Sequence, residues 1–164
     1  YGGTIENRTS FGVEIAKEIR KKIGDNIPIF ARISVTAYHP NGWDIQSSIL
    51  LSKKLREVGV DLIDCSSGGN YSDQKIKLEK GYQVTLSKSI KEGAEILTGT
   101  VGLISDNSHA EKILSDNEAD AIFLGRELLR NPYWSLYSQE DINAWPLQYQ
   151  RSFEGTGKIK YIRE

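Results

Sequence analysis

The sequence predicts an α/β protein that forms half of a (β/α)8 barrel, with about four parallel strands and helices packed outside them. Short runs rich in β-branched residues alternate with segments whose apolar residues recur at helical spacing, a pattern typical of a parallel sheet. Each expected strand also ends in glycine or polar residues, and barrel enzymes build their sites at the carboxyl ends of their strands. Four such units could also form an open doubly wound sheet, but the polar strand ends favour the half-barrel.

The expected elements alternate along almost the whole chain. Helices are predicted where apolar residues repeat every three to four positions, at 11–23, 45–58, 84–90, 107–114 and 127–130. Strands are predicted at 29–35, 60–65, 95–98 and 121–124. Gly24 and Gly59 are positioned to end helices, whereas Asp44 and either Asp106 or Asn107 are positioned to begin them.

The composition excludes several classes of protein. The chain has 164 residues with 21 basic and 22 acidic side chains, a balance that argues against nucleic-acid binding. No apolar run approaches the roughly 18 residues of a membrane span. The single cysteine, Cys65, excludes an intrachain disulfide and fits a cytoplasmic setting. Because the chain begins at Tyr1 and contains no methionine, we expect it to be a piece of something longer.

Two regions are expected within the chain. Residues 1–145 carry the strand and helix pattern, so they are predicted to form the βα units of the half-barrel. Residues 146–164 are polar and include Gly155 and Gly157, so they are predicted to form a C-terminal arm.

The segment 120–132 is the strongest local indication of a ligand. An apolar strand ends at Gly125 and Arg126, and a helix is expected to start there at once. Glycine allows a close backbone approach, arginine binds anionic oxygens, and a helix begins with free amide hydrogens. The pattern therefore indicates a phosphate site, although a surface turn with an exposed arginine has the same local sequence.

Ordered motifs along the chain make a resemblance specific. They are Tyr1-Gly-Gly-Thr-Ile-Glu-Asn-Arg8, Phe30-Ala-Arg-Ile-Ser34, Gly59-Val-Asp-Leu-Ile-Asp-Cys-Ser-Ser-Gly68, Thr98-Gly-Thr-Val-Gly102 and Phe123-Leu-Gly-Arg-Glu-Leu-Leu-Arg-Asn-Pro132. In order and spacing they resemble the C-terminal half of the old yellow enzyme family, the FMN-dependent ene-reductases. The ending Pro146-Leu-Gln-Tyr-Gln-Arg151 is similar to the family's thermophilic-like subgroup.

The resemblance implies a cofactor site for FMN. It places Arg32 near the pyrimidine edge of the flavin, where a fixed cation stabilises the negative charge of the reduced ring. It places the backbone amide of Gly99 at the FMN phosphate together with Gly125 and Arg126, and Thr100 is a further candidate. A structural ion pair for Arg32 and simple turn geometry for the glycines are the alternatives.

The implied activity is NAD(P)H oxidation followed by hydride transfer from flavin to an electron-poor alkene of the enone type. In the family, the first four strands supply the residues that bind and protonate the substrate. We therefore assign no catalytic residue in this chain, and we expect the fragment alone to be inactive. The subgroup resemblance makes Arg151 a candidate for an arginine that reaches into a partner subunit's active site.

Other functions remain open at this point. Another phosphate-binding barrel enzyme, such as a dihydroorotate dehydrogenase-like flavoprotein, shares the site of the last strands but lacks the first and last motifs. A noncatalytic half-barrel that binds a phosphate ligand or a partner chain is also possible. A lone half would expose two strand edges and inner side chains such as Ile33 or Ile63, so we expect it to pair with the missing N-terminal half or with another copy.

The remaining reactive side chains point to no further chemistry. Cys65 lies on a predicted buried strand and is expected to be a core residue. His39 and His109 are distant in sequence and lack neighbouring ligands, so no metal site is predicted. Ser66 and Ser67 lack an accompanying His and Asp, which argues against hydrolysis.

Overall fold

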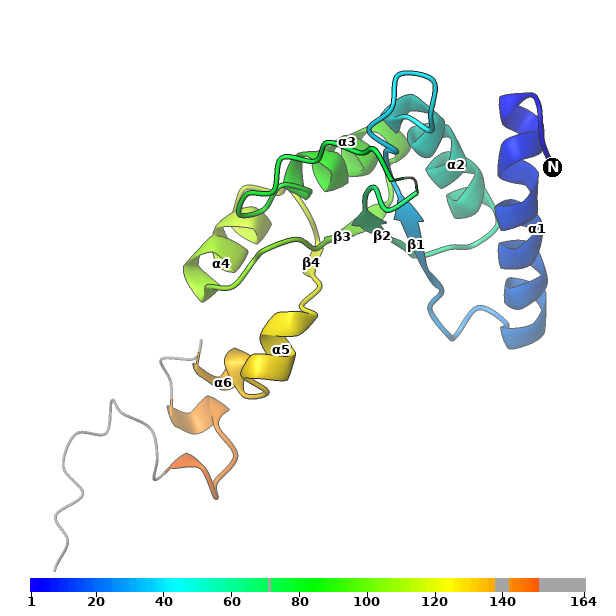
Figure 1. Ribbon diagram of the computed structural model, residues 1–164. Helices are drawn as coiled ribbons and strands as arrows, with labels where there is room; N and C mark the ends of the chain where they lie inside the picture. Colours follow the sequence, from blue (N-terminus) through cyan, green and yellow to red (C-terminus); the bar gives the residue numbers. More distant parts are fainter. Residues whose placement is uncertain (71, 138–141, 151–164) are drawn as a thin grey trace, which may run out of the picture. The chain divides into compact units, whose positions relative to one another are not determined.

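The computed structural model describes residues 1–70, 72–137 and 142–150 (Figure 1). The chain divides into two compact units, Tyr1–Leu124 and Gly125–Glu164. The first unit alternates helices and strands in the predicted order. Its elements are α1 (Ile5–Ile23), β1 (Phe30–Ser34), α2 (Ile45–Glu57), β2 (Leu62–Ser66), α3 (Val84–Ala94), β3 (Leu97–Thr100), α4 (Asn107–Ser115) and β4 (Ala121–Ile122). The second unit contains α5 (Arg126–Arg130), α6 (Trp134–Tyr137) and the 3-10 helix η1 (Ile142–Ala144).

The four strands form one parallel sheet in the order β1-β2-β3-β4, which confirms the predicted topology. Helices α2, α3 and α4 lie along one face of this sheet (Figure 1). The register aligns Arg32 with Asp64, and Asp64 with Gly99. Because side chains alternate between the two faces of a strand, these three positions share one face.

Side-chain caps explain where the helices begin. Asp44 accepts a hydrogen bond from the Ser47 backbone N–H at 2.8 Å, and Asp106 accepts one from His109 N–H at 2.9 Å. Both predicted caps are therefore confirmed, with Asp106 rather than Asn107 in the second place. Helix α1 begins earlier than predicted because Thr4 caps it through the N–H of Asn7.

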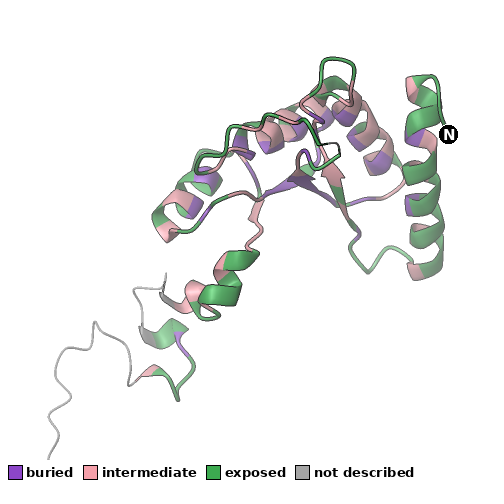
Figure 2. Cartoon of the chain, in the orientation of Figure 1, coloured by how far each residue is buried: buried purple, intermediate pink, exposed green. Residues whose placement is uncertain are grey.

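The hydrophobic core lies between the sheet and the helices (Figure 2). Its central members come from β2, from α3 and from the residue that follows β1, and several are fully buried: Val35, Ile63, Cys65, Ile90 and Ala94. None of the described helices is both long and apolar enough to cross a bilayer.

The prediction that Ile33 and Ile63 would be exposed inner side chains is wrong. Ile63 is fully buried and Ile33 packs against the same core, on the helix-covered side. The exposed apolar residues of the other face are Phe30 and Leu97, which are 57% and 54% exposed. A parallel strand is apolar on both faces, so its sequence does not reveal which set faces the helices.

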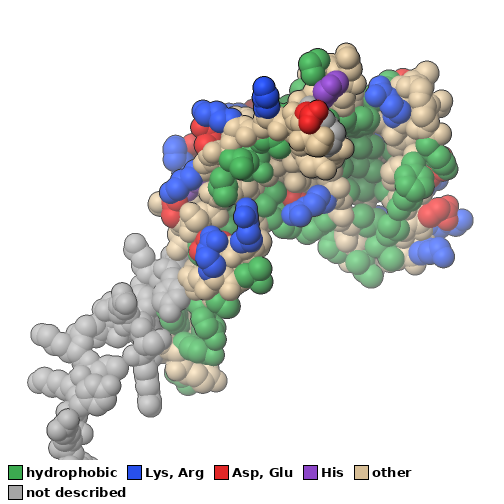
Figure 3. Space-filling view, in the orientation of Figure 1, with side chains coloured by type: hydrophobic (Ala, Val, Ile, Leu, Met, Phe, Trp, Pro, Cys, Tyr) green, Lys and Arg blue, Asp and Glu red, His purple; other side chains and the backbone are tan. Residues whose placement is uncertain are grey.

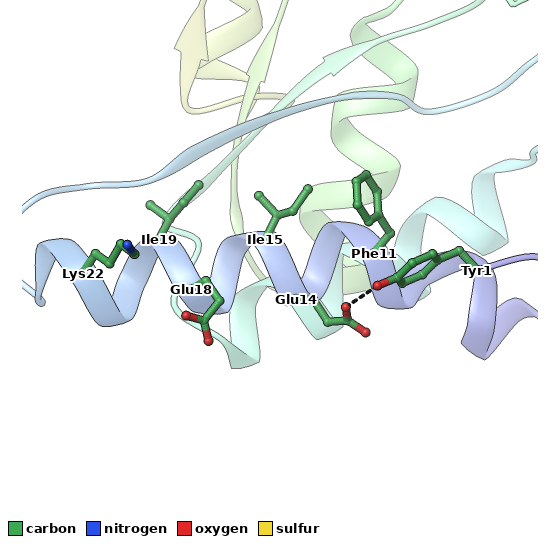
Figure 4. Close-up of a pocket in the computed structure, with 7 residues that line it drawn as sticks. All are labelled: Tyr1, Phe11, Glu14, Ile15, Glu18, Ile19 and Lys22. Carbon is green, nitrogen blue, oxygen red and sulfur yellow. Dashed lines mark hydrogen bonds between the residues drawn. The ribbon is translucent and has the colours of Figure 1, made fainter.

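Helix α1 carries two different apolar sides. Thr9 and Ala16 are buried, and Val13 and Ile23 pack against the core. The stripe that predicted this helix is instead exposed over most of its length, at Phe11, Ile15 and Ile19. These three side chains point to the same side of the helix, and Tyr1 donates to Glu14 beside them (Figure 4).

The predicted boundary between a barrel region and an arm at residue 145 stays a prediction. Residues 151–164 of that arm lie outside the described part of the chain.

Candidate functional site

An ion pair joins Arg32 and Asp64 on the sheet face opposite α2, α3 and α4. Arg32 Nε lies 2.6 Å from Asp64 Oδ2, and the two side chains are 59% and 9% exposed. In the described residues, the buried Asp64 Oδ1 has no hydrogen-bond partner. The pair therefore fixes one edge of the guanidinium through a buried carboxylate and leaves the rest of the cation accessible to a ligand.

Sequence reasoning did not single out Asp64. A signal was present, because Asp64 is an acidic residue inside an apolar strand and Arg32 is a basic residue inside the neighbouring one. Arg32 does form an ion pair, as the alternative interpretation predicted, but that pair uses only one edge of its guanidinium. An ion pair through Nε and a ligand contact through the exposed nitrogens are compatible in one residue.

Gly99 follows Asp64 across the same sheet face, and the ring of Phe123 lies over it. A Cβ atom at Gly99 would come within 2.0 Å of Phe123 Cε2. The local role of this glycine is to make room for that ring. Its predicted backbone contact with a phosphate stays a prediction.

Thr100 lies on the opposite face of β3 from Gly99. It is fully buried, and its Oγ1 has no hydrogen-bond partner in the described part of the chain. A ligand on the Arg32 side would therefore meet Thr100 only through its backbone. Two residues later Gly102 adopts a φ of +123° and accepts a hydrogen bond from Gly81 N–H at 3.0 Å.

The described residues of the loops that follow β1, β2 and β3 (35–44, 67–70 with 72–83, and 101–106) form what we call the rim. A chain of side-chain hydrogen bonds crosses it. Tyr38 OH lies 3.0 Å from Ser67 Oγ, Ser67 Oγ donates to Gln83 Oε1 at 2.6 Å, and Gln83 Nε2 donates to Val101 O at 2.7 Å. Gln83 is only 2% exposed. The buried amide therefore connects the loops after β2 and β3, and the Tyr38–Ser67 contact extends the connection to the loop after β1.

Sequence reasoning missed Gln83 as well. It occupies the N-cap position of α3, yet its side chain makes no capping hydrogen bond and turns to the neighbouring loops. Its partners are 16 and 18 residues away, so no local pattern reveals them.

The remaining predicted residues belong to the second unit or lie beyond the described residues. Gly125 caps α5, and its carbonyl accepts a hydrogen bond from Leu128 N–H at 3.1 Å. Arg126 is the first residue of that helix and is exposed. The predicted cofactor site draws Arg32, Gly99 and Thr100 from one unit and these two residues from the other, so it stays a prediction. Arg151 lies outside the described residues.

Cys65 is a buried core residue, as predicted. Burial, with a smaller contribution from Asp64, raises the pKa of its thiol from 9.0 to about 12. A thiol that stays protonated at neutral pH is a poor nucleophile. Among the described residues, no group of three or more His, Cys, Asp or Glu side chains is arranged to hold a metal ion.

A family model for the NADH:flavin oxidoreductase / NADH oxidase family matches residues 1–144. The chain belongs to this family. Its members are flavin-dependent oxidoreductases, so the part of the resemblance that names the flavin oxidoreductase family is confirmed.

Solved structures with similar folds include two large enzymes. One is 2-naphthoyl-CoA reductase in complex with 2-naphthoyl-CoA, which matches 80% of this chain with 25% identity and a TM-score of 0.72. The other is histamine dehydrogenase from Rhizobium sp. 4-9, which matches 83% with 24% identity and a TM-score of 0.69. The chain spans 21% and 20% of these proteins. The matches support the fold class, in which four parallel strands form part of a (β/α)8 barrel.

Proposed function

We propose that this chain is the C-terminal part of an FMN-dependent NAD(P)H oxidoreductase of the thermophilic-like subgroup, which reduces electron-poor alkenes such as enones. The Arg32–Asp64 pair carries the proposal. Its exposed guanidinium stands on the sheet face that the three covering helices leave open, and a buried carboxylate fixes its orientation. Family membership supplies the cofactor class.

The residues present fit FMN. Bound FMN supplies hydride transfer from its N5 position. Arg32 would hold the pyrimidine edge of the ring, where the reduced form accumulates negative charge, and Asp64 keeps that cation oriented. The backbones of Gly99 and Thr100 with Gly125 and Arg126 are the proposed phosphate contacts, and arginine is well suited to hold phosphate oxygens.

The chain supplies one part of the active site in this proposal. The residues that bind and protonate the substrate within the same subunit come, in this proposal, from the first four strands of the barrel, and the chain spans about a fifth of its solved relatives. Arg151 is the proposed contribution to a partner subunit's substrate site. Replacing Arg151 with alanine in the full-length protein is expected to raise the KM for the alkene, and an unchanged KM and kcat would contradict a shared site.

The surfaces left open in the first unit support a second polypeptide segment as partner. The Phe11, Ile15 and Ile19 stripe of α1 is exposed, and Phe30 is exposed on β1 at the edge of the sheet. Apolar side chains gather on the visible side of the molecule around α1 (Figure 3). We propose that the N-terminal half of the barrel, or a second copy of this chain, covers these surfaces.

An FMN titration tests the proposal. In the full-length protein, saturable quenching of flavin fluorescence and NADPH oxidation that depends on a cyclic enone are expected. Flavin binding without any such oxidation would favour the alternative of a noncatalytic binding module. Absence of any flavin binding would refute the cofactor and the function together. The same titration of the isolated chain shows whether the site forms without the rest of a barrel.

A further inference from the structure

We infer that Gln83 is a positioning residue that holds the rim in the arrangement that binds the cofactor, an inference that rests on the proposed function. Gln83 lies at the end of the loop before α3. Its amide oxygen accepts from Ser67 at the start of the same loop, and its amide nitrogen donates to Val101 in the loop after β3. Its burial keeps water from competing for these bonds, so they are stronger than they would be at the surface.

The chemistry of the amide fixes the direction of every bond in this chain. Val101 O only accepts, so the amide nitrogen of Gln83 must face it, and the amide oxygen must face Ser67. The single hydroxyl proton of Ser67 then goes to Gln83. Tyr38 is consequently the donor in its 3.0 Å contact with Ser67. The series runs from Tyr38 through Ser67 and Gln83 to Val101 with one orientation only.

Contacts beside the amide link it to the end of β3. A Cβ atom at Gly102 would come within 2.8 Å of Gln83 Nε2 and 2.7 Å of Tyr82 Cε1. Gly102 follows Val101, whose carbonyl accepts from Gln83, and Gly102 O itself accepts from Gly81 N–H. Segment 81–83 thus sets the backbone path at the carboxyl end of β3, where barrel enzymes bind phosphate.

A second glutamine in the same loop provides a matched control. Gln74 Oε1 accepts from Gly69 N–H at 2.6 Å, and Gln74 Nε2 donates to Ala37 O at 3.1 Å. It makes the same kind of bridge, but it joins only the loops after β1 and β2. Of the two bridges, only Gln83 reaches the loop after β3.

The first experiment compares Gln83→Leu with Gln74→Leu in the full-length protein, with FMN fluorescence quenching as the readout. The side chain of leucine is similar in size but leaves the Ser67 hydroxyl and Val101 carbonyl without their partner. We expect FMN affinity to fall about tenfold or more in Gln83→Leu, the size that follows from leaving two half-buried polar groups without this partner. Gln74→Leu is expected to change affinity less than about threefold.

A second variant keeps the test decisive if Gln83→Leu fails to fold. In Gln83→Glu, a protonated carboxyl accepts from Ser67 and donates to Val101 as the amide does, whereas the ionised form turns a charged oxygen toward a carbonyl. We expect the ratio of its FMN dissociation constant to that of the wild type to be near one at pH 5 and to rise about tenfold at pH 8, because burial favours the neutral carboxyl. The wild type is titrated in parallel because other ionisable groups lie on the same loops, among them Tyr38, Tyr82, Lys80 and Asp106, and because His109 of α4 lies beside Gly81.

Each outcome separates the positioning role from a merely structural one and from the proposed function. Wild-type FMN affinity in both Gln83 variants, even with a lowered melting temperature, would overturn the positioning role and leave the proposed function intact. An equal loss of affinity in Gln74→Leu would overturn the specific role of the bridge to β3. A wild-type protein that does not bind FMN would overturn both the inference and the proposed function.

Discussion

Arg32 and Asp64 stand opposite each other on adjacent parallel strands, with 2.6 Å between Nε and Oδ2. The carboxylate is nearly buried while the guanidinium is more than half exposed. Removing either partner leaves the other charge without its counterion. The cost in folding free energy is larger when the buried carboxylate is the group left unpaired. The two substitutions therefore change the electrostatic potential of the proposed flavin site in opposite directions.

Replacing Arg32 with methionine is expected to lower the midpoint potential of bound FMN. In the proposed site, the variant removes the cation that would stabilise the reduced, negatively charged ring, so the reduced form is expected to become less favourable. We expect a shift of about 30 mV or more to negative values, which corresponds to a tenfold change in a two-electron equilibrium. Equilibrium titration against a reference dye measures it.

Asp64→Asn is the companion to that variant and is expected to raise the potential. It keeps a hydrogen-bond acceptor for Arg32 Nε but removes the compensating negative charge. A shift of both variants in the same direction would show that the change reflects general disruption of the site rather than charge.

Gly99→Ala is expected to destabilise the fold by about 1–3 kcal/mol, because the new methyl group overlaps the ring of Phe123. Urea unfolding measures the effect. Gly12→Ala is the matched control, since Gly12 lies on exposed α1 and the nearest atom to an added Cβ there is Leu51 Cδ1 at 3.9 Å. That control is expected to gain about 0.5–1 kcal/mol in helix stability. The prediction fails if the two variants are equally stable.

The buried thiol of Cys65 makes stability fall at high pH. Its pKa is about 12 in the folded chain and 9.0 ordinarily, so between these values the unfolded state has lost a proton that the folded state retains. The contribution of this thiol to the unfolding free energy is complete below pH 9 and is lost as pH rises toward 12. Between pH 8 and 10 the unfolding free energy falls by about 1 kcal/mol for this reason. The unfolding free energy of Cys65→Ala is expected to lack this pH-dependent component over the same range. Identical slopes of unfolding free energy against pH in the two proteins would contradict the prediction.

Ile15→Lys tests the exposed stripe of α1. Ile15 is 44% exposed, so the variant is expected to change the unfolding free energy of the isolated chain by less than about 0.5 kcal/mol. It is expected to weaken association with the N-terminal half of the barrel or with a second copy, measured by sedimentation. Lys17→Glu, also on an exposed position of α1, is the control. Unchanged association in Ile15→Lys would remove this stripe from the proposed interface.

The order of elements was predictable because local chemistry specifies it. The Asp44 and Asp106 caps depend on hydrogen bonds to residues only three positions away, and both were read correctly. The strands were found within one or two residues at most ends because β-branched runs and glycines mark them. The Thr4 cap was missed because the apolar stripe that defined α1 begins later, at Phe11.

The candidate site was only partly predictable. Arg32 and the glycines were singled out by motif, but their partners depend on strand register and on which face of the sheet the helices cover. The choice of Ile33 and Ile63 as inner residues failed for this reason, since either face of an apolar strand could have been the covered one.

The sequence by itself determined the fold class, the parallel alternation, the caps and the flavin oxidoreductase family, because these depend on local propensity and ordered motifs. Only the tertiary structure decided that Asp64 holds Arg32, that Phe123 occupies the space above Gly99 and that Gln83 joins the loop after β2 to the loop after β3. Those contacts join residues 16 to 32 positions apart along the chain, and they exist only after the sheet brings its strand ends together.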